Sequence, residues 1–149
     1  MRQSVRAIVL KDDALLVMRR DKFGQEFYAL VGGGVDVGET LEQALHREIK
    51  EETGLTVSNP RLVIIEDAGK FFGMQHIYVC DYVSGEPALA PDSEEAKITA
   101  LGQNLYQPLW LPLQDLPHTE LRPAELKQAL LGMLPDKFPE QPLQLTIPD

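Results

Sequence analysis

Three glutamates, Glu48, Glu51 and Glu52, lie within five residues of one another in a short segment of the chain. Apolar residues at helical spacing predict that this segment, residues 40–53, forms an α-helix. At about 100° per residue, Glu48 and Glu52 fall on the apolar side of the helix and Glu51 lies on its flank. Because an ordinary surface helix places its carboxylates on the polar face, this pattern predicts acidic side chains that point inward.

This inward placement is unfavourable unless a cation neutralises the charge. Like charges four residues apart destabilise a helix by about 0.2–0.5 kcal/mol even in water, and burial adds to the cost. Arg47 can pair with Glu51, but one guanidinium cannot neutralise three carboxylates. A divalent cation can, and a site with oxygen ligands alone favours Mg²⁺ or Mn²⁺. The alternative is that Glu48, Glu51 and Glu52 form a solvated acidic patch.

A glycine-rich segment, residues 32–39, precedes the helix and contains four glycines. We expect a loop whose backbone N–H and C=O groups stay uncovered near a ligand, although a plain flexible turn has the same composition. Thr40 and Gln43 match the capping-box pattern and place the start of the helix. Gly54 is the expected stop.

The rest of the chain alternates apolar strands with one further helix. Residues 123–134 predict that helix, and residues 88–103 are predicted to be a polar loop. The proline-rich tail, residues 135–149, is not expected to be regular. This mixture favours an α/β or α+β arrangement in layers. The expected strands are residues 4–10, 14–20, 27–31, 61–65, 75–83 and, at a sheet edge because of its two prolines, 105–113.

Composition excludes several classes of protein. The chain of 149 residues carries a formal charge of −9, which argues against DNA binding but not against a phosphate ligand bound through a cation. Its single cysteine, Cys80, excludes an internal disulfide and a multi-cysteine zinc site. No apolar run reaches the length of a membrane span. We therefore expect one cytoplasmic domain without a membrane segment.

The segment from Gly33 to Leu55 resembles the complete Nudix box. Every fixed position of the pattern is filled by a matching residue. The resemblance implies an α/β/α sandwich around a mixed β-sheet, with residues 1–134 as the domain and a homodimer as a family-level expectation. It also implies Mg²⁺- or Mn²⁺-dependent hydrolysis of a pyrophosphate bond in a nucleoside diphosphate derivative. The matching residues are Gly33, Glu39, Arg47-Glu48-Ile49, Glu51-Glu52 and Gly54-Leu55.

The same resemblance implies roles for the glutamates of the helix. Glu48 and Glu52 would be the principal metal ligands, and Glu51 would be a ligand or the general base. The backbone carbonyl of Gly32 or Gly33 would supply a further oxygen ligand.

The resemblance also implies roles for residues outside this group of glutamates. Arg47 is implied to orient the glutamates, together with Glu39, rather than to contact the substrate. Glu94 and Glu95 are candidate bases because some relatives use a glutamate from this region, and a solvated loop is the alternative interpretation.

Substrate contacts are predicted from residue type and position. Arg19 and Arg20 end a strand beside the glycines and could hold a phosphate, with a solvent-facing strand end as the alternative. Phe72, Phe71 and Tyr28 could stack on a base, although aromatic residues more often belong to a core or its rim.

The substrate itself is predicted only by elimination. The motifs of several specialised relatives are absent, so a nucleoside triphosphate, a nucleotide sugar or a similar compound is the default. The alternative function is a catalytically silent, Nudix-like nucleotide sensor, although such proteins usually lack glutamates that this chain retains. A Ca²⁺ site of the EF-hand type has a different spacing of acidic residues.

Overall fold

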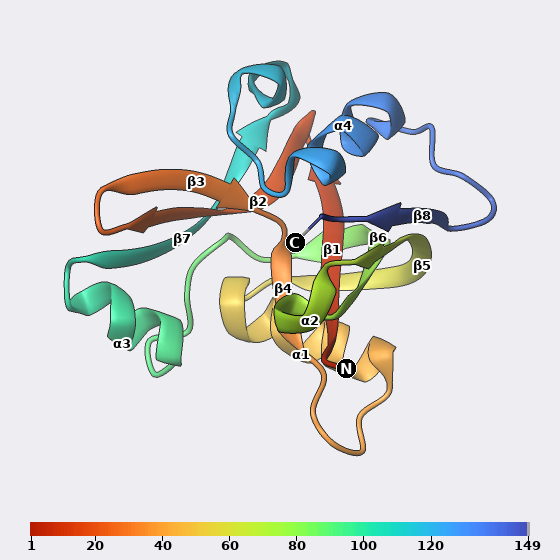
Figure 1. Ribbon diagram of the computed structural model, residues 1–149. Coiled ribbons are helices and arrows are strands. Elements are labelled where there is room, and N and C mark those ends of the chain that lie inside the picture. Colours follow the sequence, from red (N-terminus) through yellow and green to blue (C-terminus); the bar gives the residue numbers. More distant parts are fainter. Residues whose placement is uncertain (149) are drawn as a thin grey trace.

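The computed structural model describes residues 1–148 of the chain and contains strands, α-helices and one 3-10 helix. Figure 1 shows their arrangement in space. The helices are α1 (Leu41–Thr53), α2 (Gly69–Phe72), α3 (Glu94–Ala100) and α4 (Ala124–Met133), with the 3-10 helix η1 at Leu113–His118. The strands are β1 (Gln3–Lys11), β2 (Ala14–Lys22), β3 (Gln25–Ala29), β4 (Val31–Gly34), β5 (Thr56–Asp67), β6 (Met74–Ser84), β7 (Asn104–Pro112) and β8 (Leu143–Thr146).

The strands form one mixed sheet with β1 at its centre. The main order is β3-β2-β1-β6-β5-β8, while β4 also pairs with β1 and β7 with β2. β1 runs parallel to β6, and β5 runs parallel to β8, whereas the other pairs are antiparallel. In the described residues, β7 pairs only with β2, which confirms the predicted edge position of this proline-containing strand.

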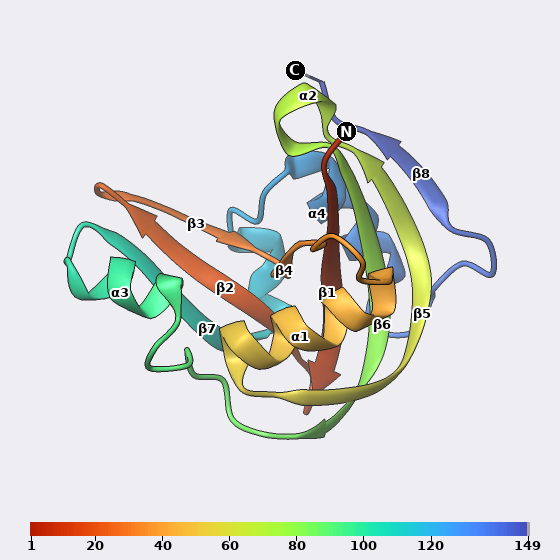
Figure 2. The ribbon, with the colours of Figure 1, turned by 90° about the horizontal axis from the view of Figure 1, so that it is seen from below.

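Helices cover both faces of the sheet, and Figure 2 shows α1 and α4 on opposite sides of it. On one face, Ala44, Leu45 and Ile49 of α1 belong to a core cluster with β1. On the other face, Leu126 and Leu130 of α4 belong to a second cluster. The predicted α/β/α sandwich is therefore confirmed. No helix within residues 1–148 has the length and apolarity needed to cross a membrane.

Alternation along β1 explains why this strand lies between the two layers. Val5, Ala7 and Val9 belong to the cluster that contains α1, and Ile8 belongs to the cluster that contains α4. Successive side chains of a strand point to opposite faces, so a mainly apolar run suits a strand that is buried on both faces. Arg6 interrupts this run, and it shares its face with Ile8.

Three segments differ from the sequence-based predictions. Residues 32–34 form part of β4 instead of a loop, because they pair with residues 4–6 of β1. The predicted polar loop, residues 88–103, contains the short helix α3. The proline-rich tail contains β8, which pairs with Ile64–Asp67 at the edge of the sheet. Two of these differences depend on a strand partner distant in sequence, and the third is a helix of only seven residues, so local composition predicts none of them.

Candidate functional site

The predicted helix is confirmed together with the residues at its two ends. Thr40 Oγ1 accepts a hydrogen bond from the backbone N–H of Gln43 at 3.1 Å, and Gln43 Oε1 accepts one from Thr40 N–H at 2.9 Å. This reciprocal pair satisfies two backbone donors at the start of α1. Gly54 ends the helix with φ of 75°, a conformation that glycine adopts without strain. The phase of the helix, and thus the direction of its glutamates, is set by these caps and by its apolar face.

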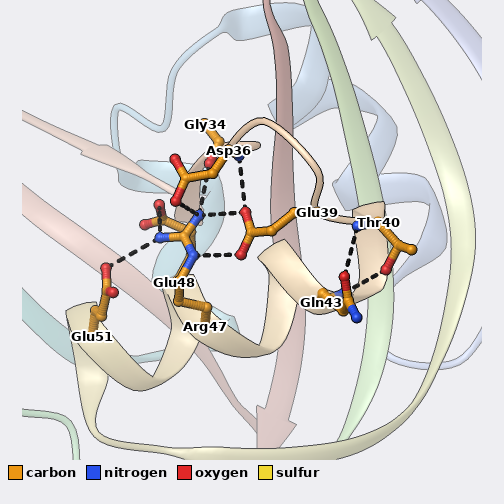
Figure 3. A network of polar contacts seen from close by, with 8 residues as sticks. All are labelled: Gly34, Asp36, Glu39, Thr40, Gln43, Arg47, Glu48 and Glu51. Atoms are coloured by element: carbon orange, nitrogen blue, oxygen red, sulfur yellow. Dashed lines mark hydrogen bonds and ion pairs between the residues drawn. The ribbon is translucent and has the colours of Figure 1, made fainter.

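Arg47 lies at the centre of a network of polar contacts, which Figure 3 shows. Its Nε and Nη2 donate to the two carboxylate oxygens of Glu39 at 2.7 and 2.9 Å. Its Nη2 also donates to the backbone carbonyl of Gly34 at 3.0 Å. Its Nη1 donates to Glu48 at 2.9 Å and to Glu51 at 3.3 Å. One guanidinium thereby joins the segment before the helix, the glycine strand and two of the three glutamates.

The ion pair with Glu39 is the most tightly held part of this network. Hydrogen bonds from Arg47, together with the backbone N–H of Asp36, lower the pKa of Glu39 to about 2. Glu39 in turn raises the pKa of Arg47 above its usual range. Arg47 therefore has the position expected of a residue that orients the glutamates.

Glu52 is buried at the end of α1, with 6% of its surface exposed. Its Oε1 accepts a hydrogen bond from the backbone N–H of Gly32 at 2.8 Å. Burial raises the pKa of Glu52 to about 8, although the positive charge of Arg6 opposes this shift. A buried carboxylate of this kind gains strongly from a nearby cation.

Glu48 packs directly against the glycine strand. A Cβ atom added at Gly33 would lie 2.6 Å from Glu48 Cδ, closer than real Cβ contacts allow. Glycine is therefore required at this position for the carboxylate to reach the strand. Burial raises the pKa of Glu48, while Arg47 lowers it and Glu51 raises it further.

The donor set of these side chains fits a hard divalent cation, since it consists of oxygen atoms alone. Burial raises the pKa of both Glu48 and Glu52, the negative charges of neighbouring glutamates add to the shift, and a bound cation would relieve this penalty. As the side chains stand, no three acidic, histidine or cysteine residues within residues 1–148 are gathered closely enough to hold a metal ion. Glu51 instead contacts Arg47 and leaves 53% of its side chain exposed. Metal binding by the three glutamates stays a prediction.

The carbonyl of Gly32, a predicted ligand, is directed toward an arginine. Arg6 Nη1 donates to this oxygen at 3.3 Å and to the carbonyl of Leu30 at the same distance. As the structure stands, the Gly32 carbonyl thus has a hydrogen-bond donor where a ligand role would place a cation.

The two candidate bases on α3 differ in their surroundings. Glu95 is close enough to raise the pKa of both Glu48 and Glu52. Glu94 leaves 81% of its side chain exposed and approaches Lys97 at 3.9 Å. The structure thus brings Glu95 toward the glutamates of α1 and leaves Glu94 at the surface.

A large cavity of about 1090 Å³ opens beside Glu52. Its walls come from β2 and β3, from the start of α4, and from the segments that follow β5 and β8. The volume is ample for a small organic ligand. The residues that line the cavity include Arg6, Arg20, Glu52, Glu66, Phe71, Phe72, Gln75 and Ile147.

Some of the predicted substrate contacts line this cavity and others do not. Arg20 lines it and lies over the ring of Tyr106, with its guanidinium carbon 3.6 Å from the ring centre. Phe72 also lines it and is largely exposed, as is Phe71. Arg19 is absent from the lining and pairs with Glu26 at 2.8 Å. Arg20 and Phe72 therefore border the cavity, whereas Arg19 does not. Arg20 is itself held on β7, where its guanidinium donates hydrogen bonds to the backbone carbonyl of Leu105 at 3.1 Å and to the side chain of Asn104.

Sequence reasoning missed Arg6, Glu66 and Gln75, which line the same cavity as Glu52. Arg6 Nε donates to Gln75 Oε1 at 3.3 Å. Desolvation lowers the pKa of Arg6, while the charges of Glu52, Glu48 and Glu66 raise it. Charged residues inside apolar strands are rarely buried without a partner, and this signal is visible for both Arg6 and Glu66 in the sequence.

Comparison with known proteins gives a consistent assignment. The NUDIX domain family profile matches residues 1–131. The chain is 32% identical over 132 residues to the NAD-capped RNA hydrolase NudC of Vibrio vulnificus, an alignment that covers 86% of this chain and 46% of that protein. It is also 32% identical over 109 residues to the NudC of Photobacterium profundum, covering 73% and 37%. The matched region thus spans less than half the length of these curated relatives.

Solved structures agree with this match. A MutT NUDIX hydrolase from Burkholderia pseudomallei superposes with a TM-score of 0.65 at 25% identity, covering 86% of this chain and 95% of that one. An ADP-ribose pyrophosphatase from Streptococcus suis has the same fold, with a TM-score of 0.65, 22% identity and 98% coverage of both chains. From the match over residues 1–131, the capped acidic helix and the shared fold, we conclude that this chain belongs to the NUDIX domain family.

Proposed function

We propose that this protein is a divalent-metal-dependent pyrophosphohydrolase that cleaves the phosphoric anhydride of a nucleoside diphosphate derivative. The observation that carries the proposal is the placement of Glu48 and Glu52. Both are held against the glycine strand β4 with raised pKa values, and Glu52 lines a cavity large enough for a nucleotide. Because the chain carries a formal charge of −9, a bound cation would offset its repulsion of an anionic substrate.

Glu48 and Glu52 would hold Mg²⁺ or Mn²⁺, with Glu51 as a candidate third ligand. When bound, such an ion neutralises phosphate oxygens, lowers the pKa of a water molecule and stabilises the leaving phosphate. Arg47 contributes by fixing Glu48 through its hydrogen bond at 2.9 Å and by anchoring itself on Glu39. This arrangement keeps the carboxylates in place before a substrate arrives.

Glu95 is the stronger candidate for the residue that accepts the proton of the attacking water. It lies near Glu48 and Glu52, and its negative charge affects the pKa of both. Glu51 is less suited to this role, because it already accepts a hydrogen bond from Arg47. A base must approach the water that it deprotonates and must be free to take the proton.

Arg20 and Phe72 would contact the substrate in the cavity. A guanidinium can hold a phosphate through two hydrogen bonds, and an exposed phenyl ring can stack on a base. The names of the relatives, an NAD-capped RNA hydrolase and an ADP-ribose pyrophosphatase, support a substrate with a diphosphate linked to a nucleoside.

The test is a panel of nucleoside triphosphates, nucleotide sugars, ADP-ribose and NAD, incubated with purified protein and Mg²⁺ or Mn²⁺. The products are identified by mass, which also shows which bond is cleaved. We expect Glu52→Gln to lower turnover at least ~10²-fold, equivalent to about 2.7 kcal/mol of barrier. Glu42→Gln is the matched control, because Glu42 is an exposed carboxylate in the first turn of the same helix.

Two outcomes would contradict the proposal. One is the absence of metal-dependent turnover across the whole panel, and tight nucleotide binding in that case would favour the alternative of a silent sensor. The other is equal turnover by Glu52→Gln and Glu42→Gln.

A further inference from the structure

Glu66 is a buried carboxylate that the proposed reaction does not use. It lies in β5, between Gln75 of β6 and Leu145 of β8, so the backbone of this strand is paired on both sides. Only 4% of its surface is exposed. Its Oε2 has no hydrogen-bond partner within residues 1–148. Buried carboxylates are normally paired, so a residue of this kind calls for an explanation.

The polar neighbours of Glu66 direct their hydrogen bonds elsewhere. Arg6 donates to Gln75 and to the carbonyls of Leu30 and Gly32. Gln75 Nε2 donates to the carbonyl of Phe72 at 2.8 Å. Arg6 therefore supplies a favourable charge without a direct contact to Glu66 Oε2. The carboxylate keeps its capacity to accept hydrogen bonds from a molecule in the cavity.

The position of Glu66 gives a ligand access to it. Glu66, Glu52, Phe71 and Phe72 line the same cavity. The exposed rings of Phe71 and Phe72 can cover a planar group, and Glu52 marks the end where the phosphates would lie. A nucleotide in the cavity can thus place its base near Glu66 while its phosphates remain near α1.

We propose that Glu66 is a specificity-determining residue whose carboxylate accepts hydrogen bonds from N1–H and N2–H of a guanine base, so that the preferred substrates are guanosine diphosphate derivatives. This inference rests on the function proposed above and deepens it. Guanine is the base with two neighbouring N–H donors on one edge, and a carboxylate offers two neighbouring acceptors. Adenine and cytosine present a donor beside an acceptor, and uracil presents one donor between two acceptors.

The charge around Glu66 agrees with a ligand that donates hydrogen bonds. Burial raises the pKa of Glu66 to about 7, Arg6 opposes this shift and Glu125 adds to it. At pH 8 the carboxylate is therefore mostly ionised and acts only as an acceptor. Because Oε2 has no partner to lose, it can turn toward the ligand without breaking a hydrogen bond.

The experiment measures binding of GDP, IDP, ADP and UDP to the full chain by calorimetry at pH 8 without divalent cations, so that nothing is hydrolysed. IDP differs from GDP only by the missing N2 amine. We expect GDP to bind about 10-fold more tightly than IDP, the effect of one hydrogen bond to a charged group, and more tightly than ADP or UDP. In Glu66→Gln, GDP should bind about 10-fold more weakly, and ADP should not be weakened.

Glu140→Gln is the matched control, since it removes an exposed carboxylate outside the cavity and should leave all four affinities unchanged. Equal binding of GDP and IDP would overturn the inference, as would tighter binding of ADP or an equal loss for every base in Glu66→Gln. The readout is independent of turnover. A guanine preference without hydrolysis would refute only the proposed function, and hydrolysis without a base preference would refute only the role of Glu66.

Discussion

The backbone N–H of Gly32 donates a hydrogen bond to Glu52 Oε1 at 2.8 Å, which joins strand β4 to the last turn of α1. Gly32 has a φ of +148°, and a Cβ atom at this position would lie 1.9 Å from the carbonyl oxygen of Val5. The glycine is thus required by the close approach of β1. Through this hydrogen bond, the packing of two strands fixes the position of a buried carboxylate.

Gly33→Ala should displace Glu48, because the new Cβ would lie 2.6 Å from the carboxyl carbon. We expect kcat/KM to fall about 10–100-fold. Tm should change little, since the flexible Glu48 side chain can move away at low cost in stability. Steady-state kinetics and thermal unfolding measure the two effects. Gly34→Ala is the control, as its Cβ would meet only the Arg2 side chain at 3.5 Å. Equal kinetic effects of the two substitutions would refute the role of Gly33.

Arg47→Lys should weaken the site even though the positive charge is retained. A lysine cannot hold both oxygens of Glu39 and also reach Gly34 and Glu48. We expect kcat/KM to fall at least about 10-fold. A double-mutant cycle with Glu39→Gln should be strongly non-additive, since both changes break the same contact. Additive losses would show that Glu39 and Arg47 act independently.

The parts of the site that the sequence predicted are those with a local signal. The capping box, the stop at Gly54 and the apolar face of α1 lie within residues 40–54, so pattern alone placed the helix and its glutamates. The contact of Arg47 with Glu51 was predictable for the same reason, because the two are four residues apart.

The parts that the sequence did not predict depend on distant partners. Gly32–Gly34 form a strand only because β1 lies alongside, and β8 exists because β5 offers a free edge. Glu66 and Arg6 lie in predicted or adjoining strand segments, but only the assembled sheet shows that they line one cavity with Glu52. The spacing of the glutamates also did not show that Glu51 leaves 53% of its side chain exposed to solvent.

The stability of the protein should depend on the ionisation of Glu66. Its pKa is raised from 4.5 to about 7 in the folded state, mainly by burial, so the folded protein holds this proton more tightly than the unfolded chain. The resulting stabilisation is fully present below pH 4.5 and is lost as the pH rises through about 7.

Glu66→Gln cannot ionise and should escape this loss. As the pH rises from 4.5 to 8, the wild type should lose unfolding free energy relative to the variant, by about 3 kcal/mol at most. Urea denaturation at several pH values measures it, with Glu140→Gln as the control. A difference that does not vary with pH would contradict the assignment.

Removal of the C-terminal segment should impair substrate binding more than chemistry. A chain ending at residue 140 lacks β8, which pairs with β5, and also lacks Ile147, which lines the cavity. We expect KM to rise about 10-fold while kcat changes less, because Glu48 and Glu52 lie on a different element. The control is a chain ending at residue 148.

If that truncated chain does not fold, Ile147→Ala provides the same test with β8 retained. Its backbone N–H still donates to the carbonyl of Asp67, and only the side chain in the cavity is shortened. An unchanged KM in this variant would show that the segment does not contribute to binding.

Glu48 and Glu52 are proposed to hold a divalent cation, and equilibrium binding of Mn²⁺, followed by electron paramagnetic resonance, tests this role without any substrate. We expect Mn²⁺ binding by the wild-type protein and by Glu42→Gln, and at least a 10-fold loss of affinity in Glu48→Gln and in Glu52→Gln. Equal Mn²⁺ affinity in all four proteins would contradict the claim.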